Sequence, residues 1–223
     1  MPTATATAKS EATRELLVST ALRLFRDVGY EKTTMRAIAS AANVSTGSAY
    51  YYFASKDDLV HELYRSLQEE HRARALPLLH EGQNLGELLR IVLNTGIDVM
   101  EPYHDFGSNF IGIAIKPSAT TSPFGSESAV ARARAIALFR QAVAMSRPQP
   151  PLAIRDDLPE LLWFAYMAVT LFWVYDSSPS QARTRRLIHQ VAPLISKLVI
   201  LSRLPVVRKI VEDVVQLIRG TRE

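Results

Sequence analysis

The stretch TTMRAIASAANVSTGSAYYYF, residues 33–53, decides the fold of this chain. Its apolar residues recur at helical spacing in two short segments, and the alternation of a strand is missing. Thr34 can cap the first segment, and Ser45 can cap the second, which ends near Phe53. Asn43 lies between them and enters the left-handed backbone region at little cost. The stretch therefore predicts a helix, a tight turn and a second helix.

Helical patterns continue on both sides of this stretch. Upstream, residues 9–28 carry an apolar stripe that stops at Gly29, a residue suited to a helix C-cap. Downstream, Ser55 and Asp58 form a capping box for a helix that reaches about residue 72. Further caps and prolines predict helices at residues 84–102, 106–115, 126–147, 157–176, 178–201 and 205–218. No strand pattern is present, so we expect an all-α fold.

These helices predict two domains of different size. Residues 1–11 are small and polar and read as a flexible tail. Residues 12–72 form an N-terminal helix-turn-helix head, and residues 73–223 form a larger helical body. Asp157 and Ser178 are the expected N-caps of two helices in that body.

Composition and charge set further limits. The chain has 223 residues and no cysteine, which excludes disulfides, thiolate metal sites and a cysteine nucleophile. Residues 1–72 hold nine basic and nine acidic side chains, so bulk charge does not mark the head as a nucleic-acid binder. The apolar run at residues 161–175 is shorter than the roughly 20 residues that span a bilayer. We expect a cytoplasmic protein with no membrane contact and with a buried helix or an oligomer interface at this run.

The helix-turn-helix closely resembles the DNA-binding domain of the TetR/AcrR family of transcriptional repressors. The resemblance covers about residues 12–72 without a gap. Asn43 stands where glycine is common in the family, and Ala49 stands where a larger apolar residue is common; both are physically compatible with the motif. The matching residues are Gly29-Tyr30, Thr33-Thr34, Ile38-Ala39, Val44-Ser45, Gly47, Tyr50-Tyr51-Tyr52-Phe53, Ser55-Lys56 and Leu59.

This resemblance implies a set of DNA contacts made mainly by the second helix of the motif in the major groove. Gly47 would allow a close approach to the bases, and Lys56 would suit a phosphate. Packing is the alternative role for Tyr52, and N-capping is the main role of Thr34. The expected DNA-binding residues are Thr34, Arg36, Thr46, Gly47, Ser48, Tyr50, Tyr51, Tyr52 and Lys56.

Beyond residue 72 the resemblance lies in helix number and length alone. It implies a homodimer formed through residues 157–176 and 178–201, and a body that binds a small effector. Aromatic residues there favour a hydrophobic or amphipathic effector. Ordinary core packing is the competing interpretation for each candidate. The candidate ligand-binding residues are His104, Asn109, Phe110, Trp163, Tyr166 and Met167.

No catalytic, metal-binding or cofactor-binding constellation is recognisable. The five histidines are scattered, and the chain has neither a phosphate-cradling glycine loop nor a nucleophile elbow. The sequence thus predicts a DNA-binding regulator that is not an enzyme, with double-stranded operator DNA as its partner. The competing hypothesis is an all-α carrier or enzyme for small apolar molecules whose head no longer binds DNA. An activator is compatible with the same motif.

Overall fold

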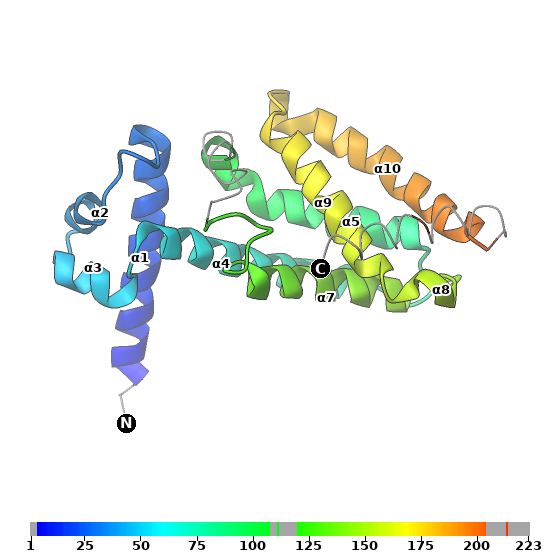
Figure 1. Ribbon diagram of the computed structural model, residues 1–223, viewed down its shortest axis with the longest axis horizontal. Helices are drawn as coiled ribbons and strands as arrows, with labels where there is room; N and C mark the ends of the chain where they lie inside the picture. Colours follow the sequence, from blue (N-terminus) through cyan, green and yellow to red (C-terminus); the bar gives the residue numbers. More distant parts are fainter. Residues whose placement is uncertain (1–3, 108–110, 112–119, 204–212, 214–223) are drawn as a thin grey trace. The chain divides into compact units, whose positions relative to one another are not determined.

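The computed structural model describes residues 4–107, 111, 120–203 and 213. Within these ranges the chain is helical and has no strand, so the all-α prediction is confirmed (Figure 1). The longer helices are α1 (Ala4–Val28), α4 (Lys56–Ala75), α5 (Leu85–Met100), α7 (Ala129–Met145), α9 (Leu158–Val174) and α10 (Ala182–Leu201). The shorter elements are α2 (Met35–Ala41), α3 (Thr46–Tyr52), α8 (Leu152–Arg155) and the 3₁₀ turns η1 (Leu76–Leu78), η2 (Glu101–Tyr103) and η3 (Pro179–Gln181).

The chain divides into two compact units. Unit 1 consists of Met1–Leu67 and Pro102–Arg132, and unit 2 consists of Gln68–Glu101 and Ala133–Glu223. Helix α4 supplies residues to both units, because the division falls within it. In both units together, no helix among the described residues has the length and apolarity needed to cross a membrane.

The helix-turn-helix of unit 1 forms through the local signals in its sequence. The Thr34 hydroxyl accepts a hydrogen bond from the Ala37 amide and caps α2. Asn43 has φ +54°, the left-handed value that its position in the turn requires. The Ser45 hydroxyl accepts from the Ser48 amide and caps α3. These expectations are confirmed.

Unit 1 has one apolar core below the helix-turn-helix. Phe25, Ile38 and Phe53 are each 3% exposed or less and belong to this core. Phe106 joins it from far along the chain, with its ring centroid 5.9 Å from that of Phe25. The sequence places residue 106 in the body, whereas its apolar ring buries against the core of the helix-turn-helix. The described residues of Pro102–Arg132 therefore belong to the same compact unit as α2 and α3.

Unit 2 is a bundle in which α5 packs along α10 and both contact α9. The capping box of α5 forms as predicted, with Asn84 and Glu87 exchanging side chain–backbone hydrogen bonds. A Cβ atom at Gly86 would lie 3.2 Å from the Cα atom of Pro193, so the absence of a side chain lets α5 and α10 approach closely.

Two helix starts differ in part from the sequence prediction. Asp157 precedes α9, but its side chain forms no cap hydrogen bond to that helix. The Ser178 hydroxyl does not cap η3, but it accepts a hydrogen bond from the Arg183 amide at 3.1 Å, in the first turn of α10. Asp176 shares this role, because it accepts hydrogen bonds from the amide and the hydroxyl of Thr184, at 2.8 and 2.7 Å. The sequence pattern missed Asp176 because this carboxylate lies outside the local spacing that a capping box uses.

Several predicted boundaries shift or fall outside the described residues. Helix α1 begins at Ala4, inside the stretch that the sequence assigns to a tail, and this stretch is rich in alanine, the best helix former. Of the helix predicted at 106–115, residues 106–107 are helical, as is residue 111, and the others are not described. The helix predicted at 205–218 lies outside the described residues, apart from residue 213.

Candidate nucleic-acid interface

Helix α3 is anchored on one face and open on the other. Ala49 is fully buried, and Phe53, directly after the helix, is 3% exposed. Thr46, Tyr50 and Tyr51 are exposed on the opposite side. A seven-residue helix with a buried inner face and a polar outer face can enter the major groove, where base edges are distinguishable.

Gly47 has open space around it. A Cβ atom at this position would meet only the Ser45 hydroxyl, at 4.0 Å. The fold of unit 1 therefore does not require glycine here. The absence of a side chain at Gly47 would allow a close approach to α3 from outside the chain.

The three tyrosines at the end of α3 differ in exposure. Tyr51 is 83% exposed and Tyr50 is 52% exposed, unusual for large aromatic side chains. Tyr52 is half-buried and packs against the core of unit 1, with its ring 5.2 Å from that of Tyr51 in an edge-to-face arrangement. Tyr50 and Tyr51 can thus reach a partner, while Tyr52 contributes to packing.

The remaining expected contacts on α2 and α3 are also accessible. Arg36 is exposed on the outer side of α2, and no ion pair holds it within the described chain. Thr34 is exposed, although its hydroxyl oxygen already caps α2. Ser48 is half-buried, and its backbone amide is bound to Ser45. Arg36 is the cation in this group that could bind a phosphate.

Lys56 is held by the chain itself. Its ammonium group donates to the carbonyl oxygen of Tyr30 at 2.8 Å and to those of Glu31 and Thr33 at 3.4 Å each. The same group lies 4.3 Å from the centre of the Tyr30 ring. Lys56 therefore connects the start of α4 to the turn between α1 and α2, a contact that the sequence did not reveal.

The candidate ligand-binding residues are distributed over both units. His104 belongs to unit 1, and Trp163, Tyr166 and Met167 lie on α9 in unit 2. Asn109 and Phe110 lie outside the described residues. Trp163 is buried, with its ring 5.0 Å from that of Phe164, and Met167 is half-buried.

Tyr166 occupies the centre of unit 2. Its ring lies 5.6 Å from the ring of His71 and 5.9 Å from that of Phe139, and its hydroxyl donates to the Met100 sulfur at 3.7 Å. Burial raises the pKa of the Tyr166 hydroxyl above its ordinary value, so this group stays neutral.

His71 and Gly96 complete this centre and were missed from the sequence. Burial lowers the pKa of His71, and a weaker opposing effect comes from its hydrogen bond to the Val92 carbonyl. Nδ1 of His71 has no partner in the described chain. The available signal was Gly96, a glycine in the interior of an amphipathic helix. A Cβ atom there would lie 2.7 Å from the Tyr166 hydroxyl.

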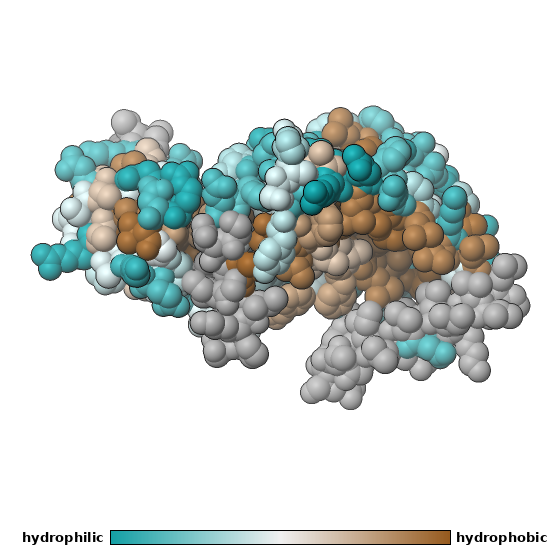
Figure 2. Space-filling view, turned by 90° about the horizontal axis from the view of Figure 1, so that it is seen from above, coloured by the Kyte–Doolittle hydropathy of each residue, from teal (hydrophilic) through white to brown (hydrophobic). Residues whose placement is uncertain are grey.

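Helices α9 and α10 carry large apolar side chains that are exposed in the single chain (Figure 2). Val169, in the middle of α9, is buried within unit 2, so α9 is covered on that side by its own chain. Large side chains on the remaining sides face solvent. They are Leu171, Phe172 and Tyr175 at the end of α9 and Leu194, Leu198, Ile200 and Leu201 on α10.

Across the described ranges, no three histidine, aspartate or glutamate side chains gather closely enough to hold a metal ion. The accessible groups on α2 and α3 are hydroxyls, phenols and one guanidinium, which suit hydrogen bonding to a polyanion.

Two family models match this chain and together cover most of it. The model described as "Tetracyclin repressor-like, C-terminal domain" matches residues 88–217, more than half of the chain. The model described as "Bacterial regulatory proteins, tetR family" matches residues 17–63, which include α2 and α3.

Curated relatives match over shorter stretches. A probable acrEF/envCD operon repressor of Escherichia coli is 40% identical over 76 residues, which are 30% of this chain and 34% of that protein. The transcriptional repressor KstR2 of Mycobacterium tuberculosis is 32% identical over 88 residues, 40% of this chain and 44% of its own length. The chain thus spans between a third and a half of the length of these relatives.

Solved structures share the fold over most of the chain. The fatty acid degradation regulator FadR from Bacillus halodurans aligns over 81% of this chain and 94% of its own, with a TM-score of 0.63 and 15% identity. Thermus thermophilus FadR, solved in complex with lauroyl-CoA, aligns over 81% of this chain and 93% of its own, with a TM-score of 0.57 and 20% identity.

Proposed function

Because this chain belongs to the tetR family of bacterial regulatory proteins, we propose that it is a homodimeric transcriptional repressor that a small ligand releases from its operator DNA. The family and its curated relatives are transcriptional regulators and not enzymes. The single observation that carries the proposal is the outer face of α3, where Thr46, Gly47, Tyr50 and Tyr51 are exposed.

The proposed DNA contacts divide into two kinds. In this proposal, Thr46, Ser48 and the backbone at Gly47 meet base edges in the major groove. Arg36, Tyr50 and Tyr51 would bind phosphates, which position the helix on the duplex. This division predicts that changes at Thr46 alter sequence preference, while changes at Arg36 weaken binding to every sequence.

Dimerisation is proposed through α9 and α10 with a second copy of this chain as the partner. Leu194, Leu198 and Leu201 follow one another at spacings of four and three residues, so they lie on one face of α10. With Leu171 and Phe172 of α9 they form an exposed apolar surface, which soluble monomers rarely carry at this size. A two-fold dimer would present two copies of α3 to half-sites roughly 34 Å apart.

The proposed effector is hydrophobic or amphipathic and binds in unit 2. Tyr166 of α9 lies against residues of α4, α5 and α7, and its surroundings combine aromatic rings with Nδ1 of His71, which has no partner among the described residues. Thermus thermophilus FadR was solved in complex with lauroyl-CoA, which is an amphipathic molecule. By linkage, a ligand that prefers the DNA-free conformation weakens DNA binding by the same factor, typically 5–150-fold.

The test is a DNA-binding titration with the full chain. Fluorescence anisotropy with duplex DNA from the region upstream of its own gene should give saturable binding that weakens linearly with the logarithm of salt concentration. Native mass spectrometry of the same protein should give the mass of a dimer and reveal any co-purified ligand. Absence of salt-dependent DNA binding would favour a carrier of small molecules instead.

A further inference from the structure

The motif proposed to bind DNA carries few free positive charges. Residues 29–56, which run from the turn before α2 to the start of α4, contain three lysine or arginine side chains, at positions 32, 36 and 56. The ammonium group of Lys56 donates to the Tyr30 carbonyl oxygen at 2.8 Å and lies over the Tyr30 ring. Lys32 and Arg36 are exposed and form no ion pair with any described residue. Two free cations therefore remain in each copy of the motif.

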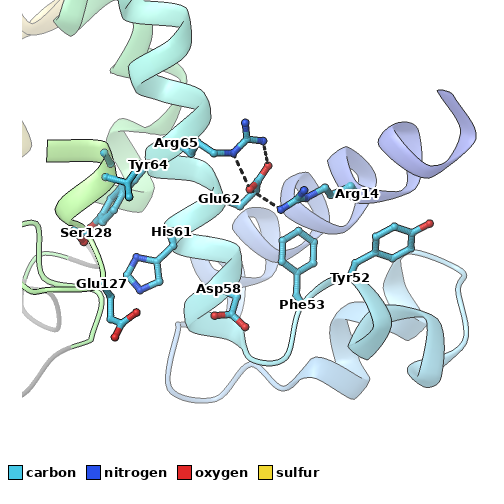
Figure 3. Close-up of a pocket in the computed structure, with 12 residues that line it drawn as sticks. Arg14, Tyr52, Phe53, Asp58, His61, Glu62, Tyr64, Arg65, Glu127 and Ser128 are labelled. Carbon is cyan, nitrogen blue, oxygen red and sulfur yellow. Dashed lines mark hydrogen bonds and ion pairs between the residues drawn. The ribbon is translucent and has the colours of Figure 1, made fainter. Parts of the chain in front are cut away.

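Two arginines elsewhere in unit 1 are already matched by a carboxylate. Figure 3 shows the guanidinium groups of Arg14 and Arg65 directed at Glu62, with distances to its carboxylate of 2.8 Å from Arg14 and 3.1 Å from Nε of Arg65. The Arg14 guanidinium also lies 5.3 Å from the centre of the ring of Phe53, a core residue. A phosphate would have to displace these contacts before either arginine could bind it.

The start of α4 adds negative charge beside the motif. Asp57 and Asp58 follow Lys56 directly in the sequence. Asp58 accepts a hydrogen bond from the Ser55 amide at 2.9 Å, and Asp57 accepts one from the Thr120 hydroxyl. The two carboxylates outnumber the one ammonium group, so the start of α4 does not attract a polyanion.

The exposed polar groups of the motif are mainly hydroxyls. Thr34 and Ser45 cap their helices through the hydroxyl oxygen, so each hydroxyl keeps its hydrogen for an acceptor outside the chain. Further exposed hydroxyls on α2 and α3 donate to no described residue; they belong to Ser40, Thr46, Tyr50 and Tyr51. Hydroxyls bind phosphates and base edges, but only a cation neutralises a phosphate and releases its counterions.

We propose that this interface selects its operator and has little affinity for duplex DNA of other sequences. Nonspecific binding is almost wholly electrostatic, with dissociation constants of about 10⁻⁴–10⁻⁶ M at physiological salt. A motif with two free cations gains little of that attraction, whereas hydrogen bonds from hydroxyls form only to correctly placed acceptors. The inference rests on the proposed function and adds which DNA the interface takes.

The free cations also set the expected salt dependence. Each phosphate that a lysine or arginine neutralises contributes about 0.9 to the slope of log affinity against log salt concentration. Lys32 and Arg36 in both copies of a dimer make about four such contacts, which gives a slope of about −3.6. Affinity should then fall about 150-fold between about 50 and 200 mM salt, whereas a protein with about 6–10 phosphate contacts loses about 10³–10⁵-fold.

Fluorescence anisotropy with the full chain tests the proposal on two duplexes. One is the DNA from upstream of its own gene, and the other is a scrambled duplex of the same length and composition. For the upstream duplex we expect a slope of about −3.6 between about 50 and 200 mM KCl. For the scrambled duplex we expect a dissociation constant weaker than about 10⁻⁴ M at about 150 mM KCl.

Variants that change the number of free cations sharpen the test. Arg36→Gln should make the slope shallower by about 1.8, because each copy of the dimer loses one contact. Ser40 is exposed and lies four positions after Arg36 on the same face of α2, so Ser40→Lys should steepen the slope by about 1.8 and make binding of the scrambled duplex measurable. Arg23→Gln removes an exposed cation of α1, outside the motif, and should leave the slope unchanged.

Three results would overturn the proposal. They are a slope steeper than about −5, a scrambled duplex bound within about tenfold of the upstream duplex, or a shallower slope in Arg23→Gln. Each of them, together with saturable binding of the upstream duplex, contradicts this selectivity and leaves the proposed function standing. Binding of neither duplex at about 50 mM KCl would contradict the proposed function, and the selectivity with it.

Discussion

The ammonium group of Lys56 lies 2.8 Å from the carbonyl oxygen of Tyr30 and 4.3 Å from the centre of the Tyr30 ring. The Lys56 ammonium group thus binds backbone carbonyl oxygens in the turn after α1 and lies over the Tyr30 ring at the same time. The contact joins residues 26 positions apart and fixes the start of α4 against the turn that precedes α2. Lys56 therefore has a role within the chain that does not depend on DNA.

Replacement of this lysine should first affect stability. Lys56→Met keeps most of the aliphatic stem but removes the hydrogen bonds and the cation–π contact, so we expect the free energy of unfolding to fall by about 1–2 kcal/mol. Urea denaturation followed by circular dichroism measures it. If Lys56 also bound a phosphate, the salt dependence of DNA affinity would fall by about 0.9 in slope. Unchanged stability together with a smaller salt dependence of DNA affinity would show that Lys56 contacts DNA and does not stabilise the fold.

A larger side chain at Gly47 should abolish DNA binding without damage to the fold. The space around this residue is open, and leucine favours helix more than glycine does, by about 0.5–1 kcal/mol. We therefore expect Gly47→Leu to have equal or higher stability in urea denaturation and no detectable DNA binding by anisotropy. If Gly47→Leu keeps its affinity for DNA, α3 does not bind in the major groove.

The phenol of Tyr51 offers a finer test of the interface. Tyr51→Phe removes one hydroxyl and Tyr51→Ala removes the whole ring, and neither should affect stability much because the side chain is largely exposed. We expect the alanine variant to lose about 1–3 kcal/mol of DNA-binding free energy and the phenylalanine variant to lose about 0.5–1.5 kcal/mol. Equal affinity in all three proteins would exclude Tyr51 from the contact.

A charge on the exposed face of α10 should separate the proposed dimer. Leu198→Glu places a carboxylate on a side chain position that is half-exposed in the single chain, so helix content should stay constant. In a dimer the same carboxylate would be buried and unpaired, at a cost of several kcal/mol. Sedimentation analysis should show a monomer. Leu152→Glu, at an exposed leucine on α8, is the matched control and should remain a dimer.

The cap at Asp176 predicts a defined dependence of stability on pH. Burial alone would raise the pKa of Asp176, but the hydrogen bonds from Ser178 and Thr184 outweigh it and hold the pKa well below its ordinary value. Because the pKa of Asp176 is lower in the folded state than in the unfolded state, the ionised carboxylate stabilises the folded protein. This stabilisation is fully present above the unfolded-state pKa of about 3.9, and it is lost as the pH falls towards the folded-state pKa.

Asp176→Asn should therefore be less stable than the unchanged protein by about 2 kcal/mol at neutral pH. The difference should shrink below about pH 4, where the aspartate begins to lose its advantage. Denaturation curves at several pH values measure this. Asp156→Asn, at an exposed aspartate before α9, should show no such trend. A constant difference across the whole range would contradict the ionised cap.

The helix-turn-helix was predictable because its signals are local. Thr34, Asn43 and Ser45 act on residues within four positions of themselves, and the structure confirms each role. The exposure of Tyr51 agrees with the DNA contact that the resemblance to the TetR/AcrR family implied for it.

Features that depend on distant contacts were not predictable. The burial of Phe106 against Phe25 joins segments about 80 residues apart, and no spacing rule reports it. The same holds for Lys56, whose partners are carbonyl oxygens and carry no residue signature. Asp176 joins Ser178 in capping α10, and it does so through the Thr184 amide, eight positions further along the chain. The local sequence pattern predicts contacts between a side chain and the backbone of its own turn. It does not predict contacts with another helix.

The close packing of Gly96 against Tyr166 also constrains how this protein can diverge. Any other residue at position 96 would place a Cβ atom 2.7 Å from the tyrosine hydroxyl and 3.0 Å from the His71 ring. Alanine at position 96 would therefore require the Tyr166 or His71 ring to move, and a smaller residue at 166 would remove the closest of these contacts. The same pair offers a route to engineering: Tyr166→Leu would open a void beside Gly96, and successive substitutions there would reshape the centre of unit 2 for molecules that the natural protein never meets.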